Sequence, residues 1–226
     1  MASTAITKLQ TDLEANGLVL LGGFEPEGNQ TVPALSNGAR PAALLLVGSA
    51  GPAIWEHFTR SPEFALPEHP LDHWTQLVVG EIASRHGAEA AFPFGGPPYW
   101  PFQQWGLRCG SMSQSPLGVL VHPRYGPWFA FRGALLFAEP LDAGLPDDGP
   151  GPCPACAGKP CLDACPSGAL TRTSSYDAEI CRCYVRENAN HDCAERGCLV
   201  RHACPFGRDH AYSRPQASFH MRAFTK

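Results

Sequence analysis

The stretch Cys153-Pro-Ala-Cys156-Ala-Gly-Lys-Pro-Cys161-Leu-Asp-Ala-Cys165-Pro166 decides how the second part of this 226-residue chain folds. Its spacing is C-x2-C-x4-C-x3-C-P. A second set follows it: Cys181, Cys183, Cys193, Cys198 and Cys204, the last of them before Pro205. Aliphatic side chains are few after residue 150, so this part can bury little core. We therefore expect bound metal to supply part of its folding free energy.

The spacing favours iron–sulfur clusters. In the bacterial run C-x2-C-x2-C-x3-C-P, three thiolates bind one cluster and the fourth serves another. Here the middle gap is two residues longer, and a turn over 157–160 can absorb the extra length. Two [4Fe–4S] clusters need eight thiolates, and nine cysteines lie in this region. Zinc is the weaker alternative. A zinc site could use a C-x2-C pair with His191 or His202, but it would not explain why both cysteine runs end in Cys-Pro. Disulfides are weaker still.

Charge and composition argue against two further classes, nucleic-acid-binding proteins and membrane proteins. Residues 1–150 carry 7 Lys and Arg against 14 Asp and Glu, whereas residues 151–226 carry 10 against 7. Two clusters would add roughly −4 to the second part, so its basic residues need no nucleic acid to neutralise them. The first residues do not form a signal peptide, and no apolar run reaches the length of a membrane span. We expect a cytoplasmic protein with no membrane partner.

Residues before the cysteine region alternate between helix and strand patterns. We expect a helix ending near Asn16, strands over 18–22 and 42–47, and helices over 51–58 and 71–86. The apolar face of the last helix is predicted to contain Trp74, Leu77, Val78, Ile82 and Ala83. Segments 117–121 and 128–138 flank a turn and predict an antiparallel hairpin. The pattern indicates an α+β sandwich in a domain over 1–145, followed by a second domain over 146–226.

Two families resemble parts of this sequence. Residues 105–204 resemble the core of epoxyqueuosine reductases and reductive dehalogenases, in the order of the cysteine runs and in Cys181-Arg-Cys-Tyr184. Residues 42–141 resemble cobalamin-processing, CblC-like proteins, most closely over 118–133. The resemblance implies a nitroreductase/CblC-like α+β sandwich that holds a corrinoid. It also implies a small ferredoxin-like iron–sulfur domain after it.

Position by position, the resemblance implies crossed ligation. One cluster takes Cys153, Cys156, Cys161 and Cys204, and the other takes Cys165, Cys181, Cys193 and Cys198. Cys181 is preferred to Cys183 because it lies three residues before Tyr184, as in the family. Cys183 and Cys109 are then not ligands. Arg132 matches an arginine near the substrate site of the CblC-like families, and Trp105 and Trp128 are predicted to line a corrinoid pocket.

We therefore expect an iron–sulfur electron-transfer protein or oxidoreductase with two [4Fe–4S] clusters that reduce a corrinoid or another cofactor of the first domain. One alternative is a plain ferredoxin-type carrier without a second cofactor. Another is a zinc-stabilised interaction protein. The expected partner is a redox protein or a small-molecule electron acceptor. We do not expect tRNA, because the helical-repeat domain of epoxyqueuosine reductases has no counterpart here.

Overall fold

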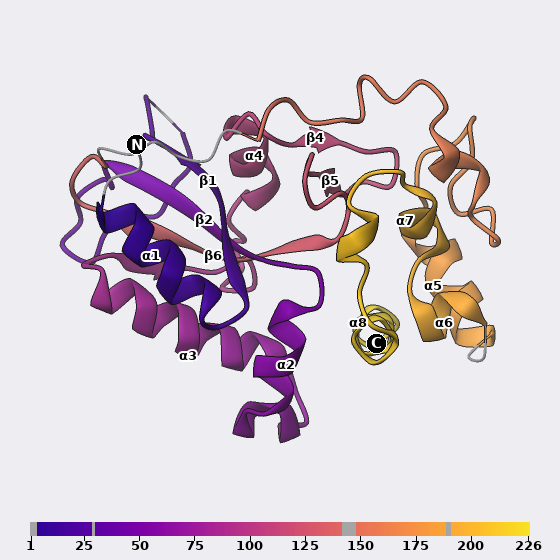
Figure 1. Ribbon diagram of the computed structural model, residues 1–226, viewed down its shortest axis with the longest axis horizontal. Coiled ribbons are helices and arrows are strands. Elements are labelled where there is room, and N and C mark those ends of the chain that lie inside the picture. Colours follow the sequence, from indigo (N-terminus) through magenta and orange to yellow (C-terminus); the bar gives the residue numbers. More distant parts are fainter. Residues whose placement is uncertain (1–3, 29, 142–147, 189–190) are drawn as a thin grey trace. The chain divides into compact units, whose positions relative to one another are not determined.

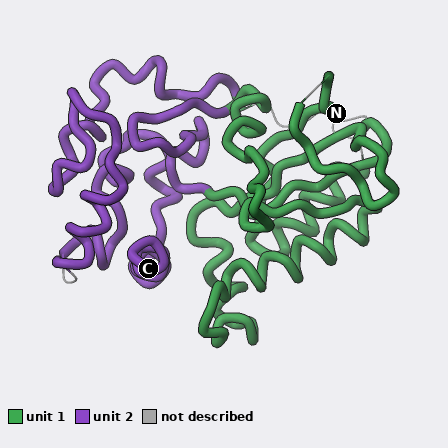
Figure 2. The backbone as a smooth tube through the Cα atoms, turned by 180° about the vertical axis from the view of Figure 1, so that it is seen from behind, with its two compact units in different colours: residues 1–111, 130–148 green, residues 112–129, 149–226 purple. Residues whose placement is uncertain are grey.

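The computed structural model describes residues 4–28, 30–141, 148–188 and 191–226. The chain forms two compact units, coloured separately in Figure 2. Unit 1 contains residues 1–111 and 130–148, and unit 2 contains residues 112–129 and 149–226. The boundary expected at 145/146 lies outside the described residues. Residues 112–129, which we had expected in the first domain, pack with the cysteine region.

Unit 1 is built on a four-stranded sheet in the order β1-β2-β6-β3. Its strands are β1 (Leu18–Phe24), β2 (Ala43–Ala50), β3 (Glu89–Ala91) and β6 (Phe129–Phe137). The pairs β1–β2 and β3–β6 are antiparallel. Every residue of β2 is buried, which is why this strand is a continuous apolar run rather than an alternating one. The predicted strands 18–22 and 42–47 are confirmed.

Helices cover this sheet (Figure 1). They are α1 (Thr4–Glu14), α2 (Ala53–Thr59), α3 (Pro70–Arg85) and α4 (Phe102–Arg108), with a 3-10 turn at Pro62–Ala65. The predicted helices up to Asn16, over 51–58 and over 71–86 are confirmed. The α+β class is confirmed with them. No helix in the described ranges is long and apolar enough to cross a membrane.

The buried face of α3 differs from the predicted one. Leu77 is 60% exposed, and the buried positions are Leu71, Trp74, Thr75, Val79, Ile82 and Ala83. Trp74, Ile82 and Ala83 are buried as predicted, Val78 is half-buried, and Leu77 is exposed. Steps of three or four residues from Trp74 fit several faces, so Leu77 and Val78 were assigned to the buried face where Thr75 and Val79 lie.

The predicted hairpin between 117–121 and 128–138 is wrong. Strand β5 (Leu120–Val121) pairs instead with β4 (Ser113–Gln114) in a separate two-stranded sheet. The chain then turns through a bridge between His122 and Gly126 before β6 begins. Since β6 joins β2 and β3, it has no free edge for β5.

Beyond β6, the described residues of unit 2 form helices and loops. Their elements are η2 (Pro160–Asp163), α5 (Ala178–Glu187), α6 (Asp192–Arg196), α7 (Leu199–Ala203), η3 (Arg208–His210) and α8 (Arg214–Phe224). The Asp177 carboxylate caps α5 by accepting the backbone N–H groups of Glu179 and Ile180. These short elements place the cysteines, and the ferredoxin-like fold of this part stays a prediction.

Candidate functional site

Four cysteines of unit 2 form the group we call the first quartet: Cys153, Cys156, Cys161 and Cys204. Burial raises the pKa of the Cys204 thiol, and the nearby thiols of the other three members raise it further. Burial likewise raises the pKa of Cys161, with Cys153 and Cys156 as its charged neighbours. The loop around η2 thus brings three thiols together, and the residue after α7 adds the fourth.

The second quartet consists of Cys165, Cys181, Cys193 and Cys198. Burial raises the pKa of Cys193, and the thiols of the other three members add to this rise. Burial is the main cause that raises the pKa of Cys181. The Cys198 and Cys165 thiols raise it further, Cys198 by the larger amount. These are the eight cysteines that the resemblance implies as ligands; that they bind two clusters stays a prediction.

Backbone N–H groups point at these sulfurs, and the two Cys-Pro pairs explain part of the arrangement. Proline has no N–H and turns the chain, so the N–H two residues after the cysteine can face back to the thiol. This happens at Cys204 with Phe206 and at Cys165 with Ser167. Burial raises the pKa of Cys165, but hydrogen bonds from Ser167 and from two further backbone N–H groups outweigh it and leave that pKa lowered.

Two polar side chains near the quartets were missed by the sequence analysis. Ser113 on β4 hydrogen-bonds the Cys153 thiol and accepts the backbone N–H of Cys153 at 3.1 Å. Tyr176 hydrogen-bonds the Cys181 thiol, and burial raises the pKa of the Tyr176 hydroxyl. Neither residue had a local signal, because each reaches its cysteine only through folding.

The remaining two cysteines stand apart. Cys183 is exposed, and its thiol donates to the Glu179 carboxylate at 3.6 Å on the surface of α5. Cys109 donates to the backbone carbonyl of Trp105 at 3.3 Å, and burial raises its thiol pKa to about 12. Such a thiol behaves as a small buried hydrophobe rather than as a reactive group.

No three His, Cys, Asp or Glu side chains in the described ranges form a group that could hold a single metal ion. The predicted cluster ligands therefore stay a prediction.

The residues predicted to hold a corrinoid are packed inside their own units. In unit 1, Trp105 is buried against Phe102 with ring centroids 4.7 Å apart, and its indole N–H donates to the Thr31 carbonyl at 3.1 Å. In unit 2, Trp128 is 1% exposed and lies against the rings of His202 and Tyr212. Neither tryptophan offers an open face to a planar ring.

Arg132 has a more polar setting on β6. Its Nε donates to the Ser49 hydroxyl of β2 at 3.3 Å. Burial raises the pKa of the nearby Asp72 carboxyl, while the positive charge of Arg132 acts in the opposite direction. Arg132 therefore lies half-buried beside an acid and a hydroxyl of its own unit.

Comparison with known proteins bears on the fold. No protein-family model and no curated protein matches the sequence. Among solved structures, the chain is similar to the crystal structure of the B12-trafficking protein CblC from C. elegans, a homologue of human MMACHC. The TM-score is 0.53 at 14% sequence identity, over 99% of this chain and 94% of that chain. The expected CblC-like fold is confirmed, and the clusters are not tested by this likeness.

Proposed function

We propose that this chain is an iron–sulfur electron-transfer protein in which each quartet binds one [4Fe–4S] cluster. The observation that carries the proposal is that eight buried or half-buried thiols of unit 2 interact as two groups of four. When bound, the clusters would supply one-electron transfer. The cysteines would hold the clusters, and the backbone N–H groups that face Cys165 and Cys204 would donate hydrogen bonds to their sulfurs.

The electrostatics of the quartets support this proposal. At Cys204 and Cys193, burial and the neighbouring thiols raise the pKa, so ionising these thiols together needs a positively charged centre. Iron ions meet this need and release the thiol protons on binding. Lys159 near Cys153, and Arg201 near Cys198, supply further positive charge.

The first prediction concerns metal content. Protein purified anaerobically is expected to be brown and to contain about eight iron and eight sulfide per chain, as two cubanes require. Iron, sulfide, zinc and cobalt analysis of the same sample measures this. About four iron would limit the proposal to one cluster. Stoichiometric zinc without iron would support the zinc-stabilised interaction protein instead.

A corrinoid is the second candidate cofactor, and the CblC-like fold is the observation that favours it. The side chains of Trp105 and Trp128 do not fit it as they stand, because neighbouring rings close both of them. We therefore derive no chemical step through a corrinoid. In this reading, unit 1 would hold the cofactor and unit 2 would supply its electrons; Arg132, within the matched stretch 118–133, is the candidate polar contact in unit 1.

The second prediction tests this cofactor. If unit 1 binds a corrinoid, titration of the anaerobic holoprotein with hydroxocobalamin should shift the visible spectrum of the corrinoid. Replacing Arg132 by glutamine should weaken that binding if the residue contacts the ligand. Unchanged spectra at concentrations well above that of the protein, with the iron intact, would leave the plain electron carrier as the better account.

A further inference from the structure

A cavity of about 290 Å³ opens between three helices of unit 2. We call it the α5–α8 cavity; its lining includes Val185 and Arg186 of α5, Ala194 and Glu195 of α6, and Ser218 and Arg222 of α8. Helix α6 packs against α8, and a Cβ on Gly197 would lie 3.3 Å from that of Ala217. The cavity is thus a feature of a packed helix group rather than of a loop.

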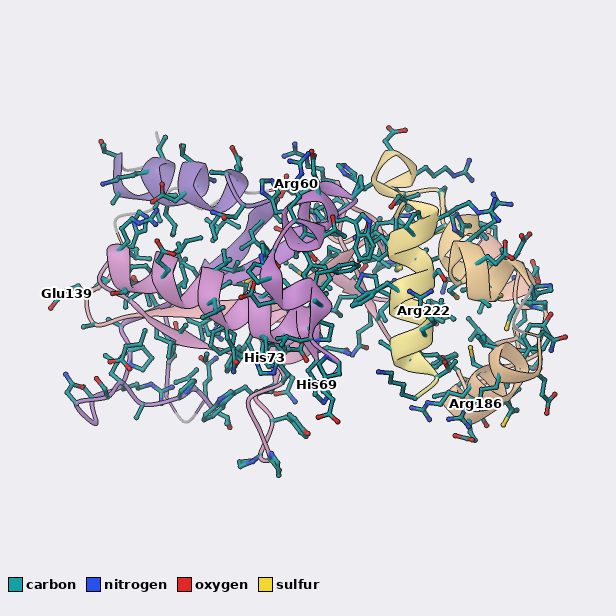
Figure 3. All side chains as sticks on the ribbon, turned by 90° about the horizontal axis from the view of Figure 1, so that it is seen from below. Arg60, His69, His73, Glu139, Arg186 and Arg222 are labelled. Atoms are coloured by element: carbon teal, nitrogen blue, oxygen red, sulfur yellow. The ribbon has the colours of Figure 1, made fainter. Side chains whose placement is uncertain are left out.

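Two arginines supply the charge of this cavity, and both are exposed (Figure 3). Arg186 donates through Nε to the backbone carbonyl of Thr225 at 2.9 Å, and Arg222 donates through Nη1 to the Ser218 hydroxyl at 2.8 Å. These bonds orient the guanidinium groups but do not neutralise them. Each group has five N–H donors, so several remain for a carboxylate.

Two other arginines of unit 2 already have carboxylate partners. Glu195 pairs with Arg214, and Arg182 pairs with Glu179 at 3.2 Å. The cations that act on the quartet thiols include Lys159, Arg172, Arg182 and Arg201.

The cavity lies one residue away from a proposed ligand. Ala194 follows Cys193 of the second quartet, and α5 carries Cys181 four residues before Val185. Electron transfer needs a donor or acceptor close to the cluster. Complexes of redox proteins are typically small, transient and steered by complementary charge.

We infer that the α5–α8 cavity is the docking site for an acidic electron-transfer protein, one carboxylate of which enters between Arg186 and Arg222. This inference rests on the proposed function. A cluster held by the second quartet would accept one electron from the reduced partner, which would be oxidised by one electron, with no covalent bond formed or broken. A neutral or basic partner would gain nothing from the two arginines.

The test uses the iron-replete holoprotein and a reduced plant-type [2Fe–2S] ferredoxin, a small acidic protein, as the probe. Stopped-flow measurement gives the bimolecular rate constant at several salt concentrations. Arg186→Gln and Arg222→Gln are each expected to lower it about fivefold at low salt and to flatten its salt dependence. Arg60→Gln, which removes the same charge from an exposed pair with Glu56 of unit 1, should leave it unchanged.

Reduction by dithionite, which needs no docked protein, should be equal in all variants and shows that the clusters are intact. Iron-replete variants that accept electrons from ferredoxin at the wild-type rate would overturn the docking site alone. Equal slowing by Arg60→Gln would also overturn it, because net charge would then be the cause. The docking site would also be overturned if the wild-type protein bound a tRNA probe, the cavity variants did not bind it, and the ferredoxin kinetics of all variants were unchanged. Wild-type protein without iron would overturn the proposed function first.

Discussion

Replacing Cys198 by alanine is expected to lower the iron content of the anaerobic protein from about eight to about four atoms per chain. Cys198 is a member of the second quartet, where burial raises its thiol pKa and Cys165 is a charged neighbour. A methyl group cannot bind iron, and the other three thiols cannot complete a four-ligand site. Because bound metal contributes folding free energy, unit 2 should also unfold at lower denaturant concentration.

The matched control for this variant is Cys183→Ala. Cys183 is exposed on α5 and hydrogen-bonded to Glu179, so its loss should leave about eight iron per chain. Iron and sulfide analysis, with circular dichroism of the same samples, measures both variants. Cluster loss in Cys183→Ala together with full iron in Cys181→Ala would show that the lone ligand was assigned to the wrong cysteine.

The second large effect is expected at Gly126, where unit 2 brings two backbone segments into contact. A Cβ at this position would lie 2.0 Å from the Phe206 carbonyl oxygen, and the residue has φ +57°. Gly126→Ala combines a backbone clash with a left-handed conformation and should cost roughly 3 kcal/mol or more of folding free energy. Since Phe206 lies two residues after Cys204, the first cluster should be lost with it.

The control for Gly126→Ala is Gly118→Ala, which introduces the same kind of backbone strain without a steric clash. Gly118 has φ +79° in the same segment, but a Cβ there would meet nothing within 4 Å. Its substitution should cost about 1 kcal/mol and leave the iron in place. Denaturant unfolding and iron analysis of both variants provide the comparison. If both variants were destabilised equally, the close contact between the Gly126 backbone and the Phe206 carbonyl would not be the cause of the effect at Gly126.

Local chemistry made much of this protein predictable. The spacing of apolar residues predicted α1, α3, β1 and β2, because each element buries a face that its own periodicity defines. The Cys-Pro pairs at Cys165 and Cys204 favoured iron–sulfur ligation over zinc, whereas the backbone N–H groups that face these two sulfurs are visible only in the structure. Spacing alone left nine cysteines in the second part for the eight ligand positions of two clusters. The family resemblance was needed to assign them to one cluster or the other.

By itself, then, the sequence determined the α+β class of the first part and the set of candidate thiols in the second. Only the tertiary structure decided that β5 pairs with β4, that Ser113 and Tyr176 reach thiols, and that Arg186 and Arg222 share a cavity. It also decided that residues 112–129 belong with the cysteines. The physical reason is that Gly126 and Gly207 allow backbone to approach backbone between segments far apart in the chain. Local periodicity and spacing do not encode such contacts.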